Sequence, residues 1–150
     1  MQGEVTVDVA APPAEVFALV SDVTRVGEFS PETFDAEWLD GADGPAVGAR
    51  FRGHVKRNGR GPVYWTTCTV VECEPERAFG FTVDFGGRVV NRWTYRLQPL
   101  GEGTELTESF ELSPTLLNRL YWAAAGRWRA RTNERGMTAT LTRIKAVAEG

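Results

Sequence analysis

Hydrophobic and polar residues alternate from residue 4 to residue 9, which is the period of a half-buried β-strand. Pro12 and Pro13 then end the strand, and Pro13 suits the first turn of a short helix with an apolar face. A second short helix is expected over about residues 23–28, because Pro31 biases the residue before it away from helical angles. The pattern therefore predicts a strand followed by a bent pair of short helices.

Six further strand-like runs follow, and turn-rich connectors separate them: GADGPAVG, NGRGP, EPER, FGGRV and PLGEG. Short turns join antiparallel strands, since a parallel connection needs a dozen or more residues. The chain is therefore expected to form an antiparallel meander. Its predicted strands are Phe34–Leu39, Ala49–Arg57, Val63–Cys73, Ala78–Phe85, Val89–Gln98 and Thr104–Leu112.

The last part of the chain has helical spacing, with Ser113 as the expected cap, Pro114 at the first helical position and a length of about 30 residues. The stripe that would face the sheet is large and apolar in its last third but small or polar in its middle, around Gly126 and Ala130. A helix packed flush on a sheet should carry large residues throughout. The small middle favours a cavity, although Gly126 and Gly136 could instead allow a close backbone approach or a kink.

The composition of this 150-residue chain is that of an ordinary globular domain, with 42% hydrophobic and 25% charged residues. Seventeen basic and 20 acidic residues give a formal charge of −3, so we expect no nucleic-acid partner. The first residues lack the features of a signal peptide, and no apolar stretch approaches the roughly 20 residues of a membrane span. We therefore expect a single domain over residues 1–150, a cytoplasmic location and no stable membrane insertion.

The sequence offers few metal ligands. It has one histidine and two cysteines, and no CxxC or HxxxH spacing occurs, so we expect neither a metal nor another cofactor. Cys68 and Cys73 lie five residues apart in one predicted strand, which would point them to opposite faces and prevent a disulfide between them.

Several motifs resemble one known superfamily. The motifs are the segment APPAEVFALVSDVTRVGEFSP, the runs VGARFRG and GEGTELTESFE, the passage from Val70 to Pro75, the strand segment Trp93-Thr94-Tyr95 and the stretch from Gly136 to Leu141. Their order is similar to that in the START, polyketide-cyclase and birch-pollen-allergen (SRPBCC) superfamily, in its bacterial polyketide cyclase/dehydrase-like branch. The resemblance covers essentially the whole chain. It implies an α+β helix-grip fold, in which a curved antiparallel sheet surrounds a long C-terminal helix.

The same resemblance implies a hydrophobic or polycyclic ligand and no universal catalytic residue. One departure is Phe29, because this branch usually has Trp before Ser-Pro. A change at this position is expected to alter the cavity mouth, so the ligand of a relative does not transfer to this chain.

Strand parity predicts which side chains face the cavity. If the turn FGGRV pairs Phe85 with Val89, then Phe81 lies opposite Trp93. If the turn PLGEG pairs Pro99 with Thr104, the inward faces of Val89–Gln98 and Thr104–Leu112 also match. The inward residues would then be Phe79, Phe81, Val83 and Phe85 on one strand, Trp93, Tyr95 and Leu97 on the next, and Leu106, Glu108, Phe110 and Leu112 on the last, with Tyr95 opposite Glu108 and Trp93 opposite Phe110.

Glu108 is thereby predicted to be a carboxylate on an apolar face. A buried carboxylate must find a donor, take up a proton or sit in a wet cavity. Candidate donors are Asn91, Tyr95 and the Trp93 indole. Alternatively, Glu108 is structural, at the cavity rim or paired with an arginine of the long helix.

The strand Val63–Cys73 remains ambiguous. A two-residue turn at Pro75-Glu76 would put the face of Tyr64, Cys68 and Val70 inward, whereas a longer turn would put Trp65 and its face there. The resemblance favours Trp65. Phe51 is expected to face inward, and His54, three residues on, outward.

Our leading hypothesis is the binding or transport of a small hydrophobic ligand, lipid-like or polycyclic, in an internal cavity. An alternative is an enzyme of the polyketide cyclase/dehydratase type with Glu108 as its acid or base. A third is an adaptor that docks another protein through the run GRWRARTNER, although the arginines of this run (Arg127, Arg129, Arg131 and Arg135) spread round the helix, as on an ordinary solvated surface. The aromatic residues could also be plain core. The predicted ligand-binding residues are Phe29, Phe51, Trp65, Phe81, Asn91, Trp93, Tyr95, Glu108, Phe110, Gly126 and Ala130.

Overall fold

A computed structural model describes residues 2–56, 62–113 and 115–150. Seven antiparallel strands form one sheet in the order β1-β7-β6-β5-β4-β3-β2, and the predicted α+β helix-grip class is confirmed. The elements are β1 (Gln2–Val9), α1 (Pro13–Ser21), the 3₁₀ helix η1 (Val23–Glu28), β2 (Thr33–Trp38), β3 (Arg50–Lys56), β4 (Val63–Glu74), β5 (Ala78–Phe85), β6 (Arg88–Leu100), β7 (Gly103–Leu112) and α2 (Leu116–Glu149).

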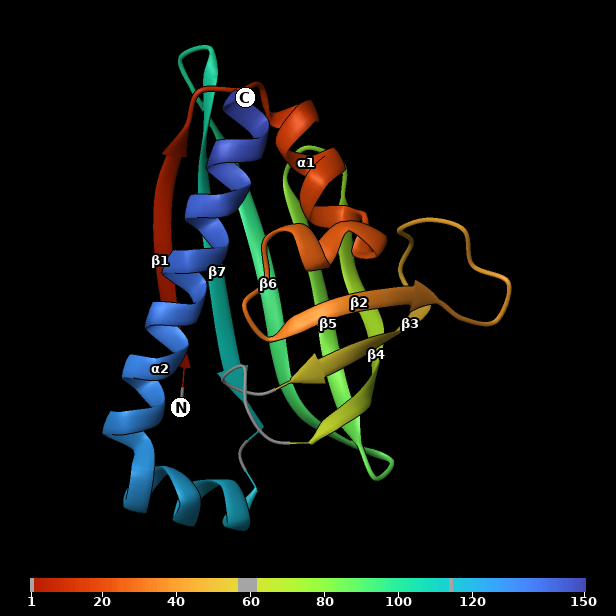
Figure 1. The fold of residues 1–150 in the computed structure, drawn as a ribbon, viewed down its shortest axis with the longest axis vertical. Helices are drawn as coiled ribbons and strands as arrows, with labels where there is room; N and C mark the ends of the chain where they lie inside the picture. Colours follow the sequence, from red (N-terminus) through yellow and green to blue (C-terminus); the bar gives the residue numbers. More distant parts are fainter. Residues whose placement is uncertain (1, 57–61, 114) are drawn as a thin grey trace.

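The sheet is strongly curved, and all helices lie on its concave side. In Figure 1, β2 and β3 run across the direction of β5, β6 and β7, while the blue helix α2 lies along β1 and β7. Two large residues near the C-terminal end of α2, Leu141 and Ile144, are fully buried in the hydrophobic core, where α2 packs against α1 and the sheet. This packing fixes one end of α2, and the first turns of the helix bend away beyond the sheet (Figure 1).

A β-bulge in β4 reverses the faces of that strand. The turn after β4 has three residues, because Glu74 pairs with Ala78 and Cys73 with Phe79, but an extra residue at Val71 places Val70 opposite Phe81. An extra residue inverts the alternation of the side chains beyond it. Tyr64, Cys68 and Val70 therefore face inward, and the prediction of an inward Trp65 is wrong.

The same bulge corrects the placement of the two cysteines. Cys68 and Cys73 both pack against the core, so the prediction of opposite faces is wrong. Both are free thiols.

The turn between β5 and β6 is tighter than expected. Gly86 and Gly87 have φ values of +62° and +78°, as a two-residue hairpin turn requires, and they pair Phe85 with Arg88 instead of Val89. A second bulge at Val90 then restores the predicted pairing of Phe81 with Trp93. Phe85 lies at the exposed end of its strand and does not line the cavity.

The predicted register of the next hairpin is confirmed. Pro99 pairs with Thr104, Tyr95 with Glu108 and Trp93 with Phe110. The expected cap of the long helix is wrong: Thr115 caps α2, and its hydroxyl accepts a hydrogen bond from the Asn118 N–H at 3.2 Å. Pro114 and Arg57, which belonged to predicted elements, lie outside the described residues. In the described part of the chain, no helix combines the length and the apolar character of a membrane span.

Candidate functional site

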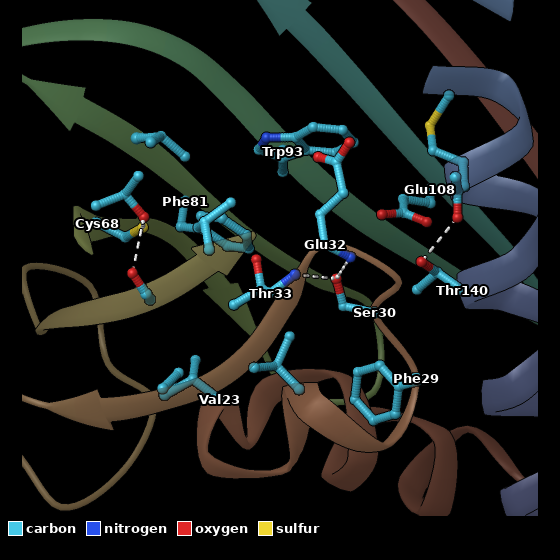
Figure 2. Close-up of a pocket in the computed structure, with 18 of the residues that line it drawn as sticks. Val23, Phe29, Ser30, Glu32, Thr33, Cys68, Phe81, Trp93, Glu108 and Thr140 are labelled. Carbon is cyan, nitrogen blue, oxygen red and sulfur yellow. Dashed lines mark hydrogen bonds between the residues drawn. The ribbon is translucent and has the colours of Figure 1, made fainter. Parts of the chain in front are cut away.

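A cavity of about 200 Å³ lies between the concave face of the sheet, the middle of α2 and the segment from η1 to β2. Most of its wall is apolar and aromatic, with Phe29 from the end of η1, Phe51 from β3, Phe81 from β5 and Trp93 from β6. Figure 2 shows these elements converging on one space. An engineered apolar cavity of about 150 Å³ can hold benzene, so this space is large enough for a small ring system.

The segment that follows η1 is held in a defined turn. The Ser30 hydroxyl accepts hydrogen bonds from the backbone N–H groups of Thr33, at 3.0 Å, and Glu32, at 3.4 Å (Figure 2). The turn directs Phe29 into the interior, where only 2% of its surface is exposed. Phe29, the predicted departure from the branch pattern, therefore forms part of the cavity wall.

Seven of the predicted site residues line the cavity. They are Phe29, Phe51, Phe81, Asn91, Trp93, Tyr95 and Glu108. The structure brings them together from the end of η1 and from β3, β5, β6 and β7.

The other four predicted residues do not line it. Trp65 lies on the outer face, where its ring stacks on His54 with centroids 4.0 Å apart and the Arg52 guanidinium lies 4.2 Å from the ring. Phe110 faces inward, but it packs between the rings of Trp93 and Trp122. A Cβ at Gly126 would lie 3.0 Å from the Trp122 ring of the same helix, so this glycine makes room for that side chain and does not line the cavity. Ala130 is half-buried beside the lining stripe.

The prediction of which α2 residues face the cavity was wrong by about one residue position. The helix presents to the cavity a polar and small set instead of Ala130: Arg129, Thr132, Asn133, Gly136, Met137 and Thr140. Asn133, Met137 and Leu141 are four residues apart and all buried, so the helical spacing of this polar residue from two apolar ones could have indicated this face.

Arg129 corrects the interpretation of the arginine run as uniformly solvated. Only 8% of Arg129 is exposed, whereas Arg127, Arg131 and Arg135 are exposed. Its guanidinium Nη1 lies 4.0 Å from the Glu32 carboxylate, an ion pair that links α2 to the segment before β2 at the edge of the cavity. The sequence alone did not indicate this pair, because the two residues are far apart in the chain.

Glu108 is the buried carboxyl of the site, with 5% of its surface exposed. Its Oε1 accepts a hydrogen bond from the Tyr95 hydroxyl at 3.2 Å, so Tyr95 is the donor among the three candidates. Its Oε2 has no partner among the described residues, and both Glu108 and Thr140 of α2 line the cavity (Figure 2). Burial raises the pKa of Glu108 from 4.5 to about 8, against the opposing effect of the Tyr95 hydrogen bond. Glu108 is therefore largely a neutral acid at pH 7.

Asn91 supplies a second polar group, at the other end of the same aromatic wall. Its Oδ1 is buried and has no hydrogen-bond partner in the described part of the chain. Nothing in residues 2–56, 62–113 and 115–150 brings together three His, Cys, Asp or Glu side chains that could hold a metal ion.

The chain matches one family over nearly its full length. The family described as polyketide cyclase / dehydrase and lipid transport matches residues 2–149. None of the curated proteins matches the sequence.

Solved structures resemble the chain as well. The polyketide cyclase-like protein Cgl2372 from Corynebacterium glutamicum has 35% sequence identity and a TM-score of 0.57, over 99% of this chain and 88% of that one. The protein CV1439 from Chromobacterium violaceum has 17% identity and a TM-score of 0.74, over 99% and 98% of the two chains. The di-domain aromatase/cyclase StfQ of the steffimycin biosynthetic pathway has 17% identity and a TM-score of 0.76, over 99% of this chain and 50% of its own. The last two show the shared fold alone.

Proposed function

We propose, from the premise that this chain belongs to the polyketide cyclase / dehydrase and lipid transport family, that it binds and carries a small, largely apolar ligand in the cavity under α2. The observation that carries the proposal is the cavity itself: a sheet wall that is largely apolar and aromatic, faced by a helix whose lining residues are mostly small or polar. Binding sites for small molecules have this composition. Affinity would come mainly from apolar area removed from water.

Titration with an environment-sensitive apolar dye tests this proposal, and filling the cavity supplies the control. A Cβ at Gly136 would have Pro31 as its nearest neighbour, at 4.0 Å, so Gly136→Phe should place its ring in the open space. Micromolar binding by the wild type should be lost in Gly136→Phe and kept in Ala124→Phe, which adds the same ring at an exposed position of α2. Equal binding by all three proteins would contradict the proposal.

A second candidate function is an enzyme that removes water from a ligand held in the same cavity. The observation that favours it is Glu108, a neutral buried acid beside Tyr95. Such a group could protonate a leaving hydroxyl, which departs as water, and the resulting carboxylate could take a proton from the adjacent carbon. Glu108→Gln should then abolish turnover of an aromatic β-hydroxyketone while its binding persists. Binding without turnover by the wild type would favour the carrier.

A further inference from the structure

Two polar atoms in the cavity wall stand without a hydrogen-bond partner in the part of the chain that the structure describes. Among the described residues, three buried side-chain atoms lack a hydrogen-bond partner, and two of them, Asn91 Oδ1 and Glu108 Oε2, belong to residues of the cavity wall. A buried polar atom without a partner costs about 1–3 kcal/mol. Both atoms can recover that cost by binding a polar group of a ligand.

Their positions in the sheet set the distance between them. Asn91 and Tyr95 are four residues apart on β6, and Glu108 lies directly opposite Tyr95 on β7. At about 3.3 Å per residue, the backbone positions that carry the two polar groups are roughly 13 Å apart along the sheet, and side chains that stand perpendicular to the sheet keep about this separation. A hydrogen bond of about 3 Å at each end leaves roughly 7 Å between the polar atoms of the ligand. Two fused six-membered rings have this length.

The wall between the two polar groups is aromatic. Trp93 lies midway between Asn91 and Tyr95 on β6, and Phe81 lies opposite Trp93 on β5. In Figure 2, Trp93 lies between Phe81 and Glu108. A flat ring system is the shape that this wall accommodates best, because rings attract one another in stacked and edge-on arrangements.

The two ends differ in chemistry. The amide oxygen of Asn91 accepts hydrogen bonds and calls for a hydroxyl or another donor. Glu108 Oε1 already accepts the Tyr95 hydroxyl, so the free oxygen Oε2 of the neutral acid can donate its proton to a carbonyl or hydroxyl oxygen. An anionic group at this end would displace or oppose the buried carboxyl.

We propose that the cavity selects a neutral, flat, two-ring ligand with a polar group at each end, a hydroxyl toward Asn91 and a carbonyl or hydroxyl oxygen toward Glu108. This selectivity rests on the proposed function, because it presupposes a ligand in the cavity. It narrows the ligand from any small apolar molecule to a hydroxylated bicyclic aromatic.

Calorimetric titration with three probes of one shape tests the proposal: naphthalene, a naphthol with one hydroxyl, and a naphthalenediol with hydroxyls at opposite ends. Each hydroxyl should strengthen binding to the wild type about fivefold, the effect of one neutral hydrogen bond. This comparison needs no variant, so it stands even if a substitution impairs folding.

Variants then assign each end. Asn91→Leu and Glu108→Met should each reduce the affinity of the diol relative to naphthalene about fivefold. The affinity for naphthalene itself should be unchanged or higher. Glu108→Gln should keep the advantage, because its amide both donates and accepts. Glu111→Gln, on the exposed side of the same strand, is the matched control and should change none of the three affinities.

Equal affinities of the three probes, or a diol advantage that survives both Asn91→Leu and Glu108→Met, would overturn the selectivity. Failure of all three probes to bind a protein that still binds the apolar dye would overturn it too and leave the carrier function standing. Failure of the dye as well would refute the proposed function itself.

Discussion

Replacing Glu108 by Gln should make the protein more stable at neutral pH. The pKa of Glu108 is about 8 in the folded protein, because burial disfavours its charged form, and 4.5 without that burial. Below pH 4.5 the folded and unfolded chains both hold the proton. Between pH 4.5 and about 8 the unfolded chain releases it while the folded chain keeps it, so stability falls as the pH rises.

The magnitude follows from the size of the shift. Each pH unit in this window costs about 1.36 kcal/mol, so the penalty at pH 7 is about 3 kcal/mol. Gln carries no titrating proton, and its amide oxygen can still accept the Tyr95 hydroxyl. Glu108→Gln should therefore match the wild type near pH 4.5 and exceed its free energy of unfolding by about 3 kcal/mol at pH 7.

Urea unfolding at several pH values between 4 and about 8 provides the assay. Glu111→Gln removes an exposed carboxylate from the same strand and should change the free energy of unfolding by less than about 0.5 kcal/mol at pH 7. Identical pH dependences of the wild type and Glu108→Gln would show that Glu108 is not a neutral buried acid. A loss of about 3–5 kcal/mol in Glu108→Gln would instead identify a buried ion pair and refute the reasoning.

Three further predictions concern neighbouring groups. Tyr95→Phe should lower the free energy of unfolding by about 1–3 kcal/mol in urea titrations, because it deprives Glu108 of its hydrogen-bond partner; an unchanged value would mean that the bond contributes nothing. Burial raises the pKa of the Cys68 thiol to about 12, so mass spectrometry after iodoacetamide treatment at pH 7.5 should find Cys73 alkylated and Cys68 intact, and the reverse order would contradict the placement of β4. Chelator treatment should leave the melting temperature of the purified protein unchanged, and a large drop would reveal a structural metal.

The fold could be predicted because the strand alternation, the turn residues and the helical tail all pointed to the same architecture. The β6–β7 register followed from one short turn, and it placed Tyr95, one of three candidate donors, opposite Glu108. The β4 register could not be predicted in this way. The extra residue at Val71 has no distinctive residue type, yet it turned Trp65 outward and Cys68 inward.

The α2 side of the site was the least predictable part. A helix face that contains small and polar residues has a weak hydrophobic periodicity. The predicted face was therefore off by one residue, and it named Ala130 where Arg129 lines the cavity. The partner of Arg129 is Glu32, which comes from the opposite end of the sequence and meets the helix only after the sheet has curved round it. Pairing of this kind depends on tertiary structure alone.

The contacts of a bound probe test the central claim most directly. Intermolecular nuclear Overhauser effects between naphthalene and the aromatic protons of the protein should connect the probe to Trp93 and Phe81, which line the cavity. They should be absent for Trp65, whose ring is stacked on His54 on the outer face of the sheet. Contacts with Trp65, or with exposed aromatic residues instead of Trp93 and Phe81, would show that apolar ligands bind the surface and that the cavity is not the site.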